Sequence, residues 1–201
     1  QQTTWKDFIA SHMAVLAGTD FFTVEVLTWR GLVTYYVLFF IHLETRRITL
    51  AGLTRHPTSE WMLQMARNAT DESSGFLRGR RYLLHDRDTK FCAAFLDGLR
   101  SSGIQPLALP ARSPNLNAFA ERWVCSIRQE CLSKLILFGE ASLRLALSEF
   151  IEHYHAERNH QGKGNLLLFP SPDATPNPKI RAVVRCRERL GGLLKYYSRA
   201  A

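Results

Sequence analysis

The sequence lacks any apolar run long enough to cross a membrane. Its longest, Val33 to Ile41, has nine residues, about half of the ~20 that a membrane-spanning helix requires. Cysteine is also scarce, with four residues and no C-x-x-C pair, so neither a disulfide framework nor a structural zinc site is indicated. We therefore expect a chain without a membrane span or a secretory signal ahead of Trp5, working in a reducing, cytoplasmic compartment.

Acidic residues are outnumbered by basic ones, 18 to 26, which gives a net charge of +8. This excess favours a polyanionic partner, because cationic side chains contact phosphates and release their counterions. Basic surfaces also serve solubility, so the charge alone favours nucleic-acid binding no more than a solvated surface. With 201 residues and 46% hydrophobic content, the chain is long enough to bury a substantial core and fits one domain with appendages.

Three acidic residues stand out against this basic background. Asp20 lies at the mouth of one apolar run, Asp86 at the end of another, and Glu121 on a predicted helix. Carboxylates that are brought together from distant parts of a chain repel one another unless cations neutralise them. Hard oxygen ligands favour Mg²⁺ or Mn²⁺, so the pattern indicates a divalent metal site.

The order of predicted elements is three strands followed by alternating helices and strands. β-branched and aromatic runs between residues 21 and 53 predict three consecutive antiparallel strands, the middle one covered on both faces. Apolar periodicity and short buried runs predict the other elements: helices over 5–16, 59–70, 91–100, 115–137 and 140–158, and strands over 82–84 and 104–109.

Three segments carry a resemblance to a known family: residues 84–91 (LHDRDTKF), 113–122 (SPNLNAFAER) and 153–160 (HYHAERNH). Together they resemble the DDE-type integrase catalytic core of bacterial insertion-sequence transposases, which is related to retroviral integrase. The likeness covers roughly residues 5 to 170, and three spaced motifs are more specific than any one. The resemblance implies an α/β, ribonuclease-H-like fold with a five-stranded mixed sheet flanked by helices, in which the first and fourth strands are adjacent.

The resemblance also implies roles for the three acidic residues. Asp20, Asp86 and Glu121 would be catalytic and would hold Mg²⁺, with Mn²⁺ as a substitute, most simply as two ions. Taken singly, each aspartate could instead be a turn residue. Asp88 competes with Asp86 for the motif position; we assign the metal to Asp86 and a loop role to Asp88, with Arg87 or Lys90 as its ionic partner.

Five further residues are expected to contact DNA. Asn117, Glu121 and Arg128 fall on one face of the predicted helix, whereas Trp123 and Ile127 fall on another that should pack inward. The resemblance gives Arg128 a phosphate contact and Asn117 a role in orienting substrate or water. It adds three cations as DNA contacts: Lys90, Arg122 and Arg158.

The function implied is that of a DNA transposase or integrase, whose partners are element ends, target DNA and further copies of the chain in the DNA complex. Its place of action would be the bacterial cytoplasm, at the nucleoid. Two alternatives share the fold: a catalytically silent DNA-binding or assembly module, and a ribonuclease-H-like nuclease. Three intact acidic residues argue against the silent module.

The last thirty residues differ in composition from the rest. Four prolines between Pro170 and Pro178 predict an extended linker. Residues 179–201 hold seven basic residues and one acidic residue around Gly191-Gly192, which fits a basic hairpin or arm as well as a solvated tail. We therefore expect a catalytic core over 1–169, a linker over 170–178 and a basic extension over 179–201.

Overall fold

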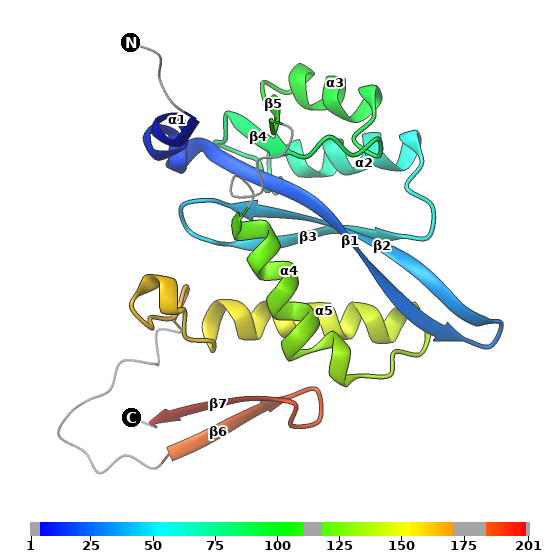
Figure 1. The fold of residues 1–201 in the computed structure, drawn as a ribbon, viewed down its shortest axis with the longest axis vertical. Helices are drawn as coiled ribbons and strands as arrows, with labels where there is room; N and C mark the ends of the chain where they lie inside the picture. Colours follow the sequence, from blue (N-terminus) through cyan, green and yellow to red (C-terminus); the bar gives the residue numbers. More distant parts are fainter. Residues whose placement is uncertain (1–4, 111–117, 171–183, 200–201) are drawn as a thin grey trace. The chain divides into compact units, whose positions relative to one another are not determined.

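The structure is a computed structural model, and it describes residues 5–110, 118–170 and 184–199 (Figure 1). Two compact units are present: one takes in the chain up to Glu25 and Arg30–Val124, the other Val26–Trp29 and the chain from Cys125 onward. The predicted boundaries at 169 and 178 stay predictions, since residues 171–183 lie outside the described ones. No helix among the described residues has the length and apolar character needed to cross a bilayer.

The first unit is built on a five-stranded mixed sheet with the order β3-β2-β1-β4-β5. β2 pairs with β3 in antiparallel fashion, whereas β1 with β4, and β4 with β5, are parallel. The first and fourth strands are therefore adjacent, as predicted. The strands are β1 (Leu16–Thr28), β2 (Gly31–His42), β3 (Ile48–Thr54), β4 (Tyr82–His85) and β5 (Gln105–Ala108).

Helices cover the sheet of this unit. α2 (Ser59–Thr70) and α3 (Ala93–Ser101) bury Met62, Phe95 and Leu99 in one cluster with Leu38 and Phe40 of the central strand. A second cluster, around Leu16, Tyr82 and Leu84, takes in side chains of α1 (Trp5–His12). Because alternate residues of a strand point to opposite faces, β2 is buried on both sides from Val37 to His42, as its apolar composition predicted.

Two predicted helices end earlier than the periodicity indicated. The first stops at His12, a 3-10 turn (η1, Met13–Val15) follows, and β1 begins at Leu16. Asp20 therefore lies within a strand rather than at a helix-to-strand turn. The helical spacing up to Leu16 is overridden because Leu16 and Ala17 are fully buried and pair with β4.

The second correction concerns the helix predicted over 115–137. α4 runs from Ala118 to Glu130, and a 3-10 turn (η3, Leu132–Lys134) follows it. Leu135 is extended, and the Leu137 carbonyl accepts a hydrogen bond of 2.9 Å from the backbone N–H of Leu27. Pairing with Leu27 thus draws the chain out of helical geometry. Residues 111–117, where the start of this helix was predicted, lie outside the described residues.

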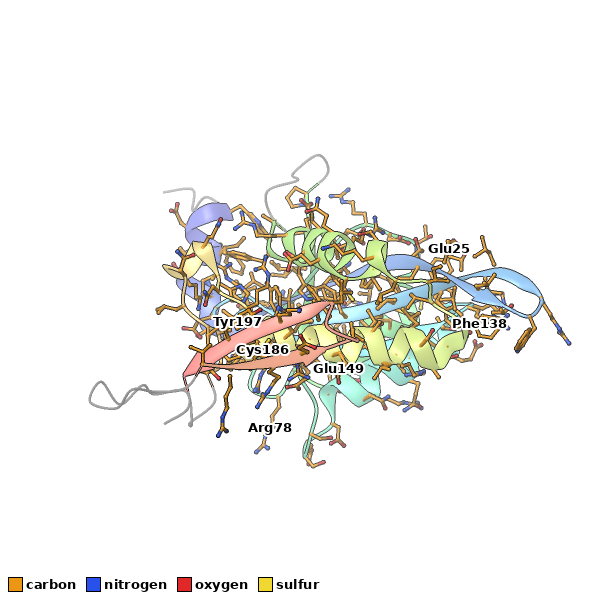
Figure 2. All side chains as sticks on the ribbon, turned by 90° about the horizontal axis from the view of Figure 1, so that it is seen from below. Glu25, Arg78, Phe138, Glu149, Cys186 and Tyr197 are labelled. Atoms are coloured by element: carbon orange, nitrogen blue, oxygen red, sulfur yellow. The ribbon has the colours of Figure 1, made fainter. Side chains whose placement is uncertain are left out.

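The second unit contains a long helix and a hairpin. α5 spans Gly139–Ala156, and β6 (Val184–Arg189) pairs in antiparallel fashion with β7 (Leu194–Arg199). The turn between the strands places Leu190, Gly191 and Gly192 at positive φ, a conformation that glycine adopts without strain. Cys186 lies opposite Tyr197 on the outward face of this hairpin, where both are exposed (Figure 2). The basic extension is thus a hairpin over 184–199.

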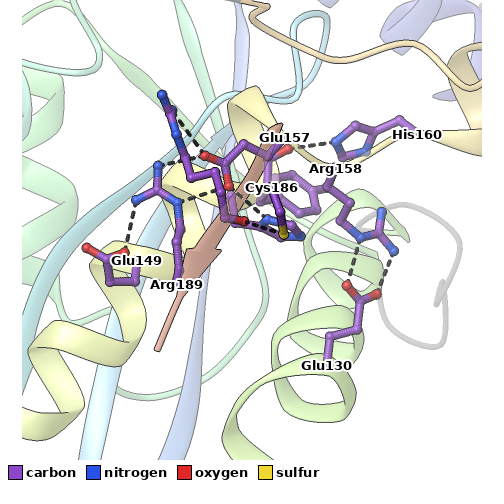
Figure 3. Close-up of polar contacts among 10 residues, drawn as sticks. Glu130, Glu149, Glu157, Arg158, His160, Cys186 and Arg189 are labelled. Carbon is purple, nitrogen blue, oxygen red and sulfur yellow. Dashed lines mark hydrogen bonds and ion pairs between the residues drawn. The ribbon is translucent and has the colours of Figure 1, made fainter. Parts of the chain in front are cut away.

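A buried carboxylate connects this hairpin to the end of α5 (Figure 3). The Glu157 side chain is 2% exposed and accepts hydrogen bonds from Arg189 at 2.8 and 3.0 Å. His153 lies 3.1 Å away from the same carboxylate, and Arg189 also reaches Glu149 at 2.9 Å. Burial opposes ionisation of Glu157, but its bonds to Arg189 and His153 outweigh this and hold its pKa below the usual value.

We predict that Arg189→Ala destabilises the protein by about 3 kcal/mol, because it leaves the buried Glu157 carboxylate without its main partner. Since the pKa of Glu157 is lowered in the folded state, its ionic contribution is present at neutral pH and is lost as pH falls below the reference value of 4.5. Thermal denaturation of both proteins at pH 7 and in acid measures this. The difference between them should shrink in acid.

The matched control is Lys195→Ala. Lys195 pairs with Glu188 at 3.0 Å on the same hairpin, but both side chains are about half exposed, so its loss should cost far less than that of Arg189. Equal destabilisation by the two substitutions would contradict a specific role for the buried carboxylate.

Candidate active site

Strand pairing brings two of the predicted metal ligands to the same level of the sheet. β1 and β4 are parallel, with Leu16 opposite Tyr82 and Gly18 opposite Leu84. Continuing that register by two residues sets Asp20 opposite Asp86, which directly follows β4. Neighbouring strands lie about 4.8 Å apart. Two carboxylates from segments far apart in sequence are therefore neighbours because of backbone pairing.

The loop after β4 fixes the backbone around Asp86. One carboxylate oxygen of Asp86 accepts the backbone N–H of Asp88 at 3.0 Å, and Asp88 in turn accepts the backbone N–H of Lys90 at 2.9 Å. These are successive turns of the kind that aspartate side chains form. Asp88 also forms an ion pair with the Lys90 ammonium group. Of its two predicted partners, Lys90 is the one observed, and Asp88 has the predicted loop role.

Glu121 lies in the first turn of α4. Two residues further on, the fully buried Trp123 packs its ring against Phe39 and Phe22, with centroids 4.4 and 5.6 Å apart. On the same turn, the Arg46 guanidinium lies 3.7 Å from the ring centroid of Phe119, a favourable cation–π contact. Trp123 faces inward, as the helical pattern predicted, and Glu121 is exposed.

The pKa of Asp20 is affected by the other acidic groups. Its pKa is raised to about 6, chiefly by burial and in smaller part by the charges of Asp86, Glu121 and Asp88, against a lowering by the hydrogen bond from the backbone N–H of Phe21 at 2.7 Å. The other two predicted ligands, Asp86 and Glu121, thus both act on the Asp20 carboxylate. Among the described residues, however, no three His, Cys, Asp or Glu side chains lie close enough together to hold a metal ion.

The predicted DNA contacts fall into different surroundings. Arg122 and Arg128 are exposed on α4. Lys90 pairs with Asp88 and lies 5.6 Å from each of the rings of Phe21 and Tyr36. The Arg158 guanidinium makes two bonds to Glu130, at 2.6 and 2.8 Å (Figure 3). Asn117 lies outside the described residues.

The three histidines near the end of α5 have separate partners. His153 bonds the Glu157 carboxylate, and His160 bonds the Tyr154 carbonyl oxygen at 2.8 Å. The His155 ring lies against Phe169, with centroids 5.3 Å apart. They form no group that could hold a metal ion among the described residues.

Arg46 is a contributor that the sequence analysis did not single out. It holds the first turn of α4, two residues from Glu121, through its contact with Phe119. The only sequence signal is the Arg46-Arg47 pair after a predicted central strand, and nothing in the local pattern connects it to a helix more than seventy residues away.

We predict that Asp20→Asn stabilises the protein in the presence of EDTA at neutral pH. The substitution removes a partly buried charge that three other carboxylates disfavour. Each ~1 kcal/mol gained should raise the midpoint of thermal unfolding by about 2–4 °C. Asp97→Asn is the control, since Asp97 is exposed and paired with Arg100 at 2.6 Å. A lower midpoint for Asp20→Asn than for the wild type would contradict crowding of carboxylates.

Comparisons with known proteins support the fold, and they match one segment of the chain to a family model. Residues 102–167 match the family model described as the integrase core domain. No curated protein matches the sequence.

One similar solved structure is a chain of the simian T-cell lymphotropic virus intasome, solved in complex with the PP2A regulatory subunit B56 gamma. It superimposes with a TM-score of 0.55 at 12% identity, and the match covers 91% of this chain and 66% of that one. The chain thus spans just under two thirds of that relative.

The HTLV-2 integrase catalytic core, in complex with magnesium, is similar in both its dimeric and its trimeric form. The TM-scores are 0.53 and 0.54 at 11% identity, over 71% and 76% of this chain and 86% and 92% of those. At such identities the likeness shows the fold. The chain thus has the ribonuclease-H-like fold of integrase catalytic cores, and about a third of it, residues 102–167, matches the integrase core domain.

Proposed function

We propose that this chain is the catalytic domain of a DNA transposase or integrase that cuts DNA at element ends and joins the 3′-hydroxyls to target DNA. The observation that carries the proposal is the set of acidic residues acting on Asp20: Asp86 from the neighbouring parallel strand and Glu121 from α4. Repulsion among carboxylates costs stability, so its presence favours a functional role for these residues over a purely structural one.

The donor chemistry of this set fits Mg²⁺. All three side chains offer carboxylate oxygens, the ligands that Mg²⁺ and Mn²⁺ favour, and a cation would remove the repulsion that raises the pKa of Asp20. A bound pair of ions would activate the attacking hydroxyl and neutralise charge developing on the phosphate. Asp20 and Asp86 would hold one ion together, and Glu121 with one aspartate the other. Because like charges keep these carboxylates apart, we infer that they draw closer when cations bind.

The cations of α4 are proposed to hold the DNA backbone. Arg122 and Arg128 follow Glu121 on α4 and are exposed, so their guanidiniums are available for charge-assisted bonds to phosphates. Asn117 would orient substrate or water. Lys90 and Arg158 would have to exchange Asp88 and Glu130 for a phosphate, which makes them weaker contributors than the α4 pair.

The partners proposed are element ends, target DNA and further copies of the chain assembled on that DNA, acting at the bacterial nucleoid in the cytoplasm. The simian virus relative is an intasome chain, and the HTLV-2 core was solved in dimeric and trimeric forms.

Removing single charges should show that the acidic residues are needed for catalysis and not for folding. We predict that Asp86→Asn and Glu121→Gln each lower strand transfer at least ~10²-fold, a loss typical of removing one group that acts in the transition state, and abolish stabilisation by Mg²⁺. The assays are joining of pre-cut oligonucleotide ends in Mn²⁺ and in EDTA, and thermal melts with and without Mg²⁺.

Asp97→Asn serves again as the control and should keep activity. Strand transfer at the wild-type rate in either variant would remove that residue from the assignment. Cleavage of RNA–DNA hybrids by the wild type without any joining would favour the nuclease alternative.

We predict that Arg128→Ala weakens DNA binding equally for all sequences, because phosphate contacts position a duplex without reading it. The slope of log affinity against log salt should fall by about 0.9, the value for one phosphate contact. Arg144→Ala is the matched control, since Arg144 is exposed and already paired with Glu140 at 2.6 Å. An unchanged slope for Arg128→Ala would make it an ordinary surface residue.

A further inference from the structure

Four large apolar side chains of the second unit are exposed at the end of β1 and in the segment that pairs with it. Trp29 is 92% exposed, Ile136 90%, Phe138 42% and Leu27 39%. We call these four residues the Trp29 patch. They are four of the nine large apolar side chains that are exposed among the described residues. Apolar surface gathered in this way marks an interaction site, whereas single exposed apolar residues do not.

Backbone pairing places these side chains on one face. Leu27 of β1 pairs in parallel with Phe138, and its N–H bonds the Leu137 carbonyl oxygen at 2.9 Å. Paired residues of parallel strands point to the same face, and so do alternate residues along a strand. Ile136 therefore lies on the side of Phe138, whereas Leu137 between them is turned inward and buried. The pairing that buries Leu137 thus forces its two neighbours outward.

An edge-to-face contact holds the two aromatic rings of the patch. Trp29 lies in the turn that follows β1, and its ring centroid is 4.7 Å from that of Phe138, with the ring planes at 80°. The charge distribution of aromatic rings favours this arrangement. Phe138 is itself fixed by its pairing with Leu27. Side chains held in this way lose little conformational freedom on binding, so the patch is preorganised for a partner.

The patch has about the apolar area of one side of a protein interface. Aromatic side chains present ~150–250 Å² each, so at their observed exposures the four side chains together offer roughly 500 Å². An interface of standard size buries about 800 Å² per partner, of which about 56–65% is apolar. The two apolar areas agree. A second surface of the same kind would therefore cover the patch.

Charged residues of both signs border the patch in sequence. Glu25 and Arg30 lie on either side of its first segment, and Lys134 and Glu140 on either side of its second. Two acids and two bases give no net charge to attract a polyanion such as DNA. They are instead complementary to their own copy across a two-fold axis, where the acids of one copy meet the bases of the other. The border thus favours a second copy of the chain over DNA.

We propose that the Trp29 patch is the surface through which a second copy of this chain binds, in a two-fold arrangement. Each copy covers the patch of the other, and Trp29 is the principal anchor, because tryptophan is enriched among the residues that carry most of the binding energy. The inference rests on the proposed function for its role, which is to bring copies together on DNA. The contact itself needs neither DNA nor metal.

The test is the oligomeric state of the whole chain in EDTA without DNA, measured by sedimentation equilibrium at ~1–100 μM. The wild type should dimerise reversibly in this range. The double substitution Trp29→Glu with Ile136→Glu sets like charges against an apolar surface and should raise the dissociation constant of the dimer at least ~100-fold. Trp29→Phe with Ile136→Leu keeps the apolar area and should retain most of the dimer.

The matched control is Leu166→Glu with Val184→Glu. These two side chains are exposed at 66% and 61% and lie outside the patch, and their substitution changes the net charge by the same amount. Figure 2 shows Phe138 well away from Tyr197, on the hairpin that holds Val184. The control should therefore leave the dissociation constant nearly unchanged. Thermal melts check that all variants are folded, as expected for substitutions at exposed positions.

A wild type that stays monomeric at ~100 μM would overturn the inference, and so would an unchanged dissociation constant in the folded patch variant. Equal weakening by the patch and control variants would reduce the effect to charge and would also overturn it. A monomeric wild type whose DNA affinity falls in the patch variant would replace the second copy by DNA. A patch-dependent dimer without any strand transfer would defeat the proposed function alone, whereas strand transfer by a strictly monomeric wild type would defeat the inference alone.

Discussion

The parallel pairing of β1 with β4 is the constraint on which the candidate site depends. Side chains at matching levels of two parallel strands point to the same face, so a register that sets Leu16 opposite Tyr82 also sets Asp20 opposite Asp86. A slip of one residue would turn one of the two carboxylates to the other face. The register is fixed by burial, since Leu16, Ala17, Leu83 and Leu84 are each fully buried. Hydrophobic packing thus positions groups that repel one another.

The described residues differ in how their charges are balanced: some form ion pairs, whereas others of like charge lie near one another. Several basic side chains of the described residues pair with carboxylates, among them Arg100, Arg144 and Arg158, and the buried Glu157 is enclosed by Arg189 and His153. The acidic residues around Asp20 depart from that pattern, because their charges disfavour one another. Unbalanced charge costs stability, because neither solvent nor a partner fully compensates it. Such charge persists where an external ion or ligand of opposite sign completes it.

Much of this fold could be predicted from sequence because strand composition and helical periodicity are local signals. The element order, the central position of β2 and the inward face of α4 with Trp123 follow from side-chain alternation alone. The boundaries that failed, at His12 and Glu130, are places where a backbone group pairs with a distant strand. Periodicity holds no information on such pairing, so Leu16 and Leu137 were predicted to continue helices.

The candidate site was predictable only in part, for the same reason. Asp20, Asp86 and Glu121 came from the family resemblance, and their mutual influence appears only when the strands are paired. The cation–π contact of Arg46 with Phe119 joins segments separated by more than seventy residues. The ion pair of Arg158 with Glu130 likewise joins residues far apart in the sequence, and the predicted DNA contact of Arg158 stays a prediction.

The contacts of Arg189 with Glu157 and Glu149 also bear on the order in which parts of the second unit fold. Its cationic partner Arg189 lies 32 residues further along the chain, and the bond from Arg189 to Glu149 closes a separation of 40 residues. Contacts at such separations form late, because the entropy of closing the loop is lost before the contact can compensate it. While the chain is being synthesised, α5 emerges well before β6 and β7, and the carboxylate of Glu157 stays hydrated in the meantime. Closure of the hairpin over α5 is therefore expected to follow the formation of α5 itself.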